Sequence, residues 1–219
     1  MIEPPYLRYV YDGLNKGSLN AENAAVLPHG FIGLYEQEFA QKTPVSEREI
    51  VLNQLALWAL FKSPVSTNLA ATVLKIEEEQ IKKLIDRYSA WFNSPESGKF
   101  QLYHDRLKLF LLSKNSDLQI DNFINIIIEF CENVLINLTS SKSEFIVFTL
   151  KNYVGFLKMG WIKHPDYYQK IKSYCFKKDI VILNYDYLAS LNYFIFSLND
   201  LFKISILLNN ENDLIEIIN

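Results

Sequence analysis

Few residues in this sequence have the types and spacing that chemistry requires. The three histidines, at positions 29, 104 and 164, are widely separated, and none has cysteines or carboxylates nearby at the spacing of metal ligands. We therefore predict no metal site. Cys131 and Cys175 lie on apolar faces of predicted helices, where cysteine usually behaves as a small buried hydrophobe. Two such distant cysteines suit neither a disulfide scaffold nor a zinc cage, which favours a reducing compartment.

The sequence motifs of common catalytic sites are missing. The chain has neither a G-x-x-x-x-G-K-[ST] nor a G-x-G-x-x-G phosphate-binding loop. It has no G-x-S-x-G nucleophile elbow and no H-E-x-x-H zinc-binding pair. We therefore expect that the chain alone is not an enzyme and holds no cofactor.

His104 is the one residue whose position suggests a specific role. It follows the alternating segment Lys99–Tyr103, a predicted strand, and precedes a predicted helix at Asp105–Leu112. If the alternation continues, its ring points inward with the other inward-facing side chains of the strand. A histidine at such a corner can donate to a phosphate oxygen, and Asp105 could orient the ring or cap the helix. The alternative is a histidine that only hydrogen-bonds the local backbone.

The elements before this corner are mostly helical. Short helices are predicted at Leu7–Leu14 and at Leu34–Ala40, the second after a loop at Leu27-Pro28-His29-Gly30. Ser46 and Glu49 have the S-x-x-E spacing of a capping box, which would open a buried apolar helix, Ile50–Phe61.

Two further helices and a turn complete this region. Ser66 or Thr67 caps a helix that continues to Leu74, and a third helix covers Glu77–Trp91. A turn at Asn93–Gly98 then leads into the strand before His104. Three helices followed by a β-hairpin are typical of a winged-helix domain, with the hairpin as its wing.

The second half of the chain reads as helices throughout. They are predicted at Ile120–Leu138, Glu144–Met159, Asp166–Phe176, Asp186–Leu198 and Asp200–Leu208. Gly160 is placed as a helix C-cap and Pro165 as a helix start. Pairs of amphipathic helices in succession suggest an α-solenoid-like region, although no exact repeat is present.

The predicted fold class is therefore mainly α. It consists of a winged-helix domain with one small β-hairpin, followed by an α-solenoid-like helical region. We predict three segments: residues 1–45 as short helices and a loop, 46–115 as the winged helix, and 116–219 as the helical repeat-like domain.

Charge and hydropathy restrict the partners. The formal net charge is −3, whereas general nucleic-acid binding needs a surplus of Lys and Arg. The predicted recognition helix begins with three glutamates, Glu77–Glu79, which would face DNA phosphates. The N-terminus lacks the pattern of a signal peptide, and the most apolar stretch, Ile180–Leu198, is interrupted by polar residues. We expect a soluble, cytoplasmic protein that binds neither nucleic acid nor a membrane.

The segment around His104 resembles a motif of the STAND ATPases, the NACHT and NB-ARC relatives of signalling and immunity. Tyr103-His104-Asp105, followed by Leu107, Phe110 and Leu111, is similar to the family's Y-H-[DE]-x-[FL]-x-x-[FL]-L segment. In that family the segment closes the winged-helix domain, and its histidine contacts the β-phosphate of bound ADP. The resemblance implies nucleotide-binding roles for His104 and Asp105.

Three other stretches resemble the same family in the same order. Leu27–Tyr35 is similar to its L-P-x-G-[LF]-x-G-L-Y segment, and Leu55–Leu60 with Pro64-Val65 is similar to the first winged-helix helix and turn. Pro4-Pro5-Tyr6-Leu7 resembles the end of the G-x-P-L-x-L segment, which implies that Pro4 lies against adenine; Ile2 replaces the motif's glycine.

This resemblance implies a non-catalytic part of a signalling ATPase. The phosphate loop, magnesium-binding strand and sensor arginine of STAND proteins precede this region, so ADP or ATP would be bound only together with an upstream ATPase domain. The expected partners are that domain and other proteins. Two alternatives stay open. One is a free-standing helical scaffold that binds a protein, which an exposed patch of Tyr167, Tyr168, Tyr174 and Tyr187 would favour. The other is a winged-helix DNA-binding regulator.

Overall fold

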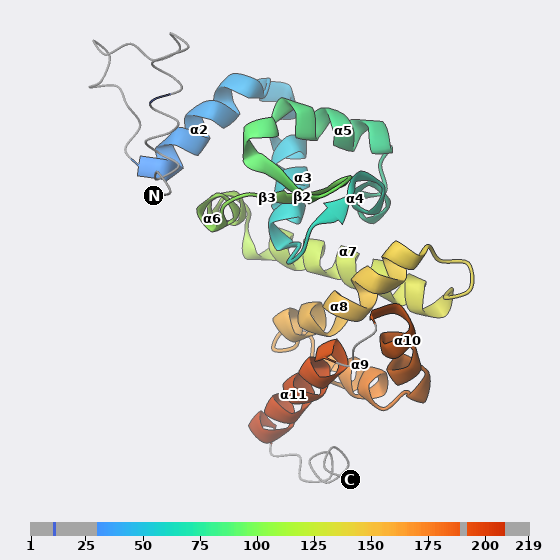
Figure 1. Cartoon of the computed structure of the whole chain (residues 1–219). Coiled ribbons are helices and arrows are strands. Elements are labelled where there is room, and N and C mark those ends of the chain that lie inside the picture. The colour runs from blue at the N-terminus through green and yellow to red at the C-terminus, as the bar shows by residue number, and fades with distance from the viewer. Residues whose placement is uncertain (1–10, 12–29, 189–191, 209–219) are drawn as a thin grey trace. The chain divides into compact units, whose positions relative to one another are not determined.

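The computed structural model describes residues 11, 30–188 and 192–208 (Figure 1). Over these residues the protein is mainly helical, with ten α-helices and one three-stranded antiparallel sheet. The predicted helical fold class is thereby confirmed. The chain divides into two compact units. The first unit comprises Met1–Thr67 and Glu77–Ser116, and the second comprises Asn68–Ile76 and Asp117–Asn219.

Four of the described α-helices belong to the first unit. They are α2 (Gly30–Lys42), α3 (Arg48–Leu60), α5 (Glu78–Arg87) and α6 (Asp105–Ser113). Helix α3 is buried over much of its circumference, as its apolar sequence predicts. The predicted third helix was too long, because α5 ends at Arg87 and a short 3₁₀ turn follows it.

The predicted capping box does not form. Ser46 lies in a 3₁₀ turn, and α3 begins after Glu47, whose side chain makes no capping hydrogen bond. The carbonyl of Pro44 accepts the Glu47 N–H at 2.9 Å, so a backbone turn occupies the place of the box. Arg48 instead closes the end of α2, since its guanidinium donates to the carbonyls of Ala40 and Thr43.

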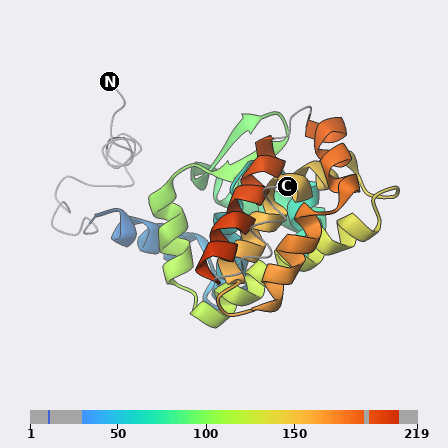
Figure 2. The ribbon, with the colours of Figure 1, turned by 90° about the horizontal axis from the view of Figure 1, so that it is seen from below.

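Of the three strands of the sheet, the sequence pattern located only the last. The strands are β1 (Val65–Ser66), β2 (Phe92–Glu96) and β3 (Lys99–Leu102), in the order β1-β3-β2. Strand β3 confirms the predicted strand, although its burial does not alternate, because Lys99, Phe100 and Gln101 are all half-buried and only Leu102 is buried. The strands β2 and β3 lie side by side in both views (Figures 1 and 2). Strand β1 has two residues, which is too short to show a period of two.

The predicted turn at Asn93–Gly98 is wrong over most of its length. Strand β2 continues to Glu96, and the turn is confined to Ser97 and Gly98, where glycine adopts a φ of 72°. Pro95 is tolerated because β2 is an edge strand, and the register shifts between Asn93 and Glu96. Proline and glycine therefore predicted the position of the hairpin correctly, but they led to the omission of its first strand, β2.

An aromatic cluster around Trp91 forms the core of the first unit. The Trp91 ring centroid lies 4.7 Å from that of Tyr88, 5.8 Å from that of Tyr35 and 6.4 Å from that of Phe110. Its indole N–H donates to Glu38 of α2 at 2.7 Å. Trp91 is 1% exposed, so one side chain joins α2, the C-terminal end of α5 and α6.

Helix α4 (Thr67–Leu74) confirms its predicted bounds and ends in a Schellman motif. The N–H of Ile76 donates to the carbonyl of Ala71 at 3.1 Å, and the N–H of Lys75 donates to that of Thr72 at 3.3 Å. Lys75 adopts a φ of 56°, the left-handed conformation that usually carries glycine at this position.

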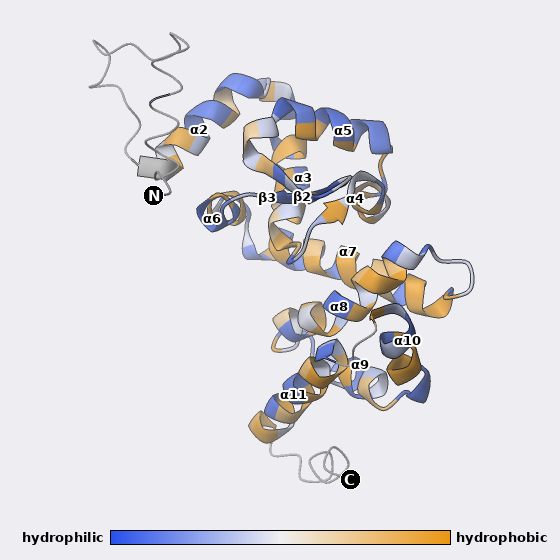
Figure 3. Ribbon diagram, viewed as in Figure 1, coloured by the Kyte–Doolittle hydropathy of each residue, from blue (hydrophilic) through white to orange (hydrophobic). Residues whose placement is uncertain are grey.

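The second unit is built around helix α8 (Ser143–Gly160). This helix contacts α7 (Asp117–Ile136), α9 (Asp166–Cys175), α10 (Lys178–Leu188) and α11 (Asn192–Leu207). Phe156 and Leu157 of α8 are completely buried. The long hydrophobic stretches of α7 and α8 are visible in Figure 3.

The predicted boundaries of the last two helices are wrong. The prediction placed helix starts at Asp186 and Asp200, whereas α10 runs through Asp186 and α11 runs through Asp200. Neither carboxylate caps a helix: Asp200 instead accepts a hydrogen bond from Lys158 of α8. Asn184 is buried inside α10, where its amide donates to the carbonyl of Ile180 at 2.8 Å.

The predicted helix Leu7–Leu14 lies outside the described residues except for Tyr11.

Gly160 has a different role from the predicted C-cap. It is the last residue of α8, and a β-carbon there would lie 2.8 Å from Cε2 of Tyr167. The Tyr167 ring is held in place, since its hydroxyl donates to Asn125 and its face stacks on His164. Gly160 is therefore required by the close approach of α9, which begins directly after Pro165.

Substitution of Gly160 tests this contact. We expect Gly160→Ala to lower the free energy of unfolding by about 1–3 kcal/mol, as overpacking in a filled core does. Met159→Ala is the control, because Met159 is 47% exposed and its loss should change stability by less than about 0.5 kcal/mol. Chemical denaturation measures both. Equal stability of Gly160→Ala and the parent would contradict the proposed clash.

The two cysteines give a second prediction. Cys131 and Cys175 are buried as expected, and burial raises the pKa of each thiol to about 12. At pH 9 both should stay protonated in the folded chain, whereas ordinary thiols with a pKa of about 8.5 are largely thiolate. Iodoacetamide at pH 9 should modify the denatured chain quickly and the native chain slowly. The raised pKa of the two thiols also contributes to the free energy of unfolding. This contribution is fully present below about pH 8.5 and is lost as the pH rises toward 12.

Rapid alkylation of either cysteine in the native chain would contradict the buried placement. Mass spectrometry of labelled peptides distinguishes the two thiols.

Candidate functional site

His104 occupies the predicted corner between a strand and a helix. It is the N-cap residue of α6, and its Nδ1 accepts the backbone N–H of Arg106 at 3.1 Å. The predicted local hydrogen bond is therefore present. The ring is half-buried, whereas Leu102, two residues earlier in β3, is 3% exposed. The predicted inward position of the ring is therefore reached only in part, and the ring sits at the edge of the core.

The Trp91 cluster fixes the position of this corner. The N–H of Tyr103 donates to the carbonyl of Trp91 at 3.1 Å, which anchors the residue just before His104. Leu107 and Leu111 of α6 are fully buried, and the helix contacts both α2 and α3. His104 is thus held by rigid elements on both sides.

The hydrogen bond to Arg106 also determines the protonation pattern of a neutral His104. Since Nδ1 accepts a hydrogen bond, it carries no proton, and the proton of the neutral ring is on Nε2. The ring can then act as a donor through Nε2. This is the chemistry that contact with a phosphate oxygen requires.

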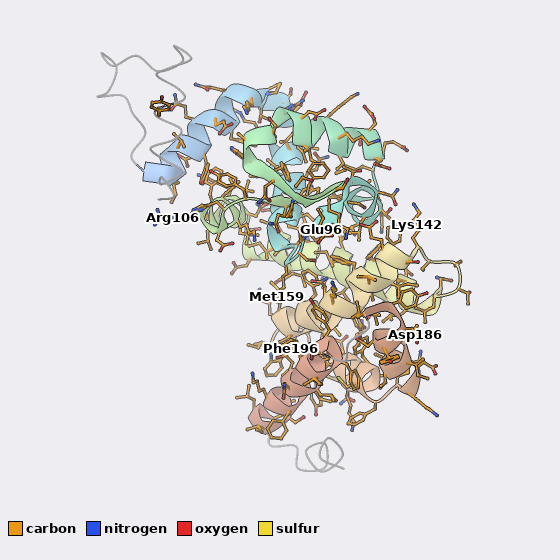
Figure 4. The ribbon with its side chains drawn as sticks, in the orientation of Figure 1. Glu96, Arg106, Lys142, Met159, Asp186 and Phe196 are labelled. Carbon is orange, nitrogen blue, oxygen red and sulfur yellow. The ribbon has the colours of Figure 1, made fainter. Side chains whose placement is uncertain are left out.

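Asp105 neither orients the His104 ring nor caps the helix. Its side chain is 93% exposed and forms an ion pair with Lys108 at 3.2 Å, one turn along α6. The capping role that the sequence suggested for Asp105 belongs to His104 itself. Arg106 is also exposed, and its side chain is labelled beside α6 in Figure 4.

The structure brings together only part of the predicted nucleotide-binding set. His104 and Asp105 are neighbours in the chain, but only His104 is held by the core. Pro4, the third predicted residue, lies outside the described residues, as does His29.

Metal-binding clusters and membrane-spanning helices are both absent from the part of the chain that the structure describes. No group of three histidine, cysteine, aspartate or glutamate side chains there is arranged to hold a metal ion. Among the same residues, every helix falls short of the length and apolar character needed to cross a bilayer.

The aromatic patch expected of a protein-binding scaffold differs from the observed surface. Tyr167, Tyr168 and Tyr174 are buried, and only Tyr187, at 39% exposed, reaches solvent. The most exposed aromatic residues of α10 and α11 are Tyr185 at 68% and Phe196 at 63%. The three buried tyrosines all belong to α9, which packs against α8 and α11.

Sequence reasoning missed two cavities of the second unit. One, of about 260 Å³, lies between α4, α7 and the start of α8. The other, of about 350 Å³, lies among α7, α8, α9 and α10 and includes Lys170 and Lys177. No motif marks either cavity, because its lining comes from helices that are far apart in the sequence.

The capping role of His104 can be measured by substitution. His104→Ala removes the acceptor for the Arg106 N–H and should lower the free energy of unfolding by about 1 kcal/mol. His104→Asn supplies another good N-cap acceptor and should retain most of the parent's stability. Thermal or chemical denaturation compares the two. Equal losses in both variants would show that the cap contributes little.

Comparison with known proteins gives no further identification: no family model, curated protein or solved structure matches this chain. Its function must therefore be inferred from the residues and their geometry.

Proposed function

We propose that this chain is a non-catalytic regulatory region of a STAND-type signalling ATPase. In this proposal residues 46–115 form a winged-helix domain that contacts a nucleotide, and residues 116–219 form a helical region that binds protein partners. An ATPase domain supplies the phosphate loop and the magnesium site. The nucleotide is ADP or ATP, held jointly by the two parts.

The arrangement of strands supports the winged-helix assignment. Along the chain the elements follow the order α3, β1, α4, α5, β2, β3, and the sheet order is β1-β3-β2. A short first strand that pairs with the last strand, together with a terminal hairpin, is typical of winged-helix domains. The hairpin β2–β3 corresponds to the wing.

The geometry of His104 carries the functional part of the proposal. The ring lies at the rim of the first unit, with Nδ1 bonded to the start of α6 and the proton on Nε2. A donor held in this way can bond an oxygen of the β-phosphate without a reorientation of the ring. Asp105 is exposed and acts on nucleotide only through its charge, and Pro4 would contact adenine.

Two observations weigh against the alternative functions. Glu77 and Glu79 are exposed at the start of α5, and Glu78 bonds Thr67 and Lys82, so DNA phosphates would meet an acidic helix end. A scaffold function would have to use exposed residues of α10 and α11, because three of the four tyrosines considered for it are buried.

The test separates phosphate binding from helix capping. The full chain is joined behind the ATPase module of a STAND protein, and the release of fluorescent ADP is followed by stopped flow. His104→Asn keeps the cap but removes the Nε2–H donor, so we expect ADP release to accelerate about 10- to 100-fold at unchanged melting temperature. Asp105→Asn is the matched control and should change the rate by less than about threefold.

Equal release rates in the parent and in His104→Asn would contradict the assigned role. The proposal also fails if the joined protein retains ADP no longer than the ATPase module alone.

A further inference from the structure

The rings of Tyr103 and His104 are in contact, although the two residues are neighbours in the chain. In a regular strand such neighbours point to opposite faces of the sheet. Here β3 ends at Leu102, Tyr103 forms a bend, and His104 already caps α6. The ring centroids are therefore only 5.8 Å apart, with an interplanar angle of 62°. This is the edge-to-face geometry that aromatic rings favour.

Tyr103 is itself held by the core of the first unit. Its backbone N–H donates to the carbonyl of Trp91 at 3.1 Å. Burial, and next the neighbouring Tyr103 side chain, raise the pKa of the Tyr35 hydroxyl, so these two side chains lie close together. Tyr35 is 2% exposed, and its ring centroid lies 5.6 Å from that of Phe110. Tyr103 is thus fixed through its backbone and through its side chain.

The His104 ring needs such a second contact to keep one orientation. The torsion between Cβ and the imidazole ring has broad energy minima. A half turn about this bond would exchange Nδ1 with Cδ2 and Nε2 with Cε1, which would break the hydrogen bond from Arg106 and displace the N–H donor. The single hydrogen bond at Nδ1 opposes this motion at one edge of the ring, and the contact with Tyr103 opposes it at a second place.

The burial of Tyr103 differs from that of a residue that only fills the core. Its side chain is 38% exposed, whereas Leu102 before it and Leu107 after it are 3% and 0% exposed. A leucine at position 103 would bury a comparable apolar stem without the ring that reaches His104. The aromatic character of this residue is therefore used mainly toward the histidine.

We propose that Tyr103 is a positioning residue for the His104 donor. Its ring limits rotation of the imidazole, so that the Nε2–H group keeps one position at the rim of the first unit. Tyr35 and Trp91 hold the Tyr103 ring in place and thereby tie the orientation of His104 to the aromatic core. The inference rests on the proposed nucleotide contact of His104, and it gives Tyr103 no contact of its own with the nucleotide.

The first test measures the orientation of the ring without nucleotide. Long-range ¹H–¹⁵N NMR of the full chain at pH 8 reports which imidazole nitrogen carries the proton, and the His104 signals are those absent from His104→Asn. We expect a single Nε2–H tautomer in the parent and in Tyr103→Phe, which keeps the ring. Tyr103→Leu removes the ring and should give a mixture of the two tautomers. A role in stability alone would leave the tautomer unchanged.

The second test follows the release of fluorescent ADP from the chain joined behind an ATPase module. Tyr103→Leu should accelerate release about three- to tenfold, which corresponds to the loss of one aromatic pair. Tyr103→Phe should stay within about twofold of the parent, as should Leu109→Ala, a control at an exposed position of α6. Tyr103→Leu added to His104→Asn should cause no further acceleration, because Tyr103 acts only through the histidine.

These outcomes separate the inference from the proposed function. A single Nε2–H tautomer in Tyr103→Leu would overturn the positioning role. A further acceleration in the double variant would overturn it as well, since Tyr103 would then act on the nucleotide independently. If His104→Asn leaves ADP release unchanged, the proposed function fails, and the tautomer measurement still decides whether Tyr103 orients the ring.

Discussion

The burial of Trp91 is the interaction on which the arrangement of the first unit depends. Its ring contacts aromatic residues of α2 and α6 and the residue that follows α5, Tyr88, while its indole N–H is satisfied by Glu38. Its backbone carbonyl in turn receives the N–H of Tyr103 at the end of β3. One residue therefore joins three helices to the sheet. The same core fixes the position of the corner that carries His104.

Much of the secondary structure could be predicted because the signals are local. Helix α4 and the start of α6 follow from capping residues and apolar spacing, and β3 follows from a clear alternation of side chains. Strand β2 could not be found in this way, because Pro95 reads as a turn unless the strand is known to lie at an edge. Likewise Asp186 and Asp200 look like helix starts, but both helices continue through them. Asp186 is exposed within α10, and Asp200 is paired with Lys158 of α8.

The candidate site was predictable in its chemistry but not in its geometry. The sequence places a histidine between a strand and a helix, and this suggested both a local hydrogen bond and a phosphate contact. Only the structure shows that Nδ1 is the atom used locally and that Asp105 points to solvent. The cavity with Lys170 and Lys177 could not be predicted from the sequence, because four helices contribute to it.

The division of the chain has a consequence for the order of folding. Helix α4 belongs to the second unit, whose other helices begin only at Asp117. Strand β1 lies just before α4, and its partner β3 begins at Lys99. During synthesis from the N-terminus, both segments must wait until their partners have left the ribosome. Such non-local pairing slows folding and prolongs the exposure of the apolar α4, so neither unit is complete until the chain has passed well beyond residue 100.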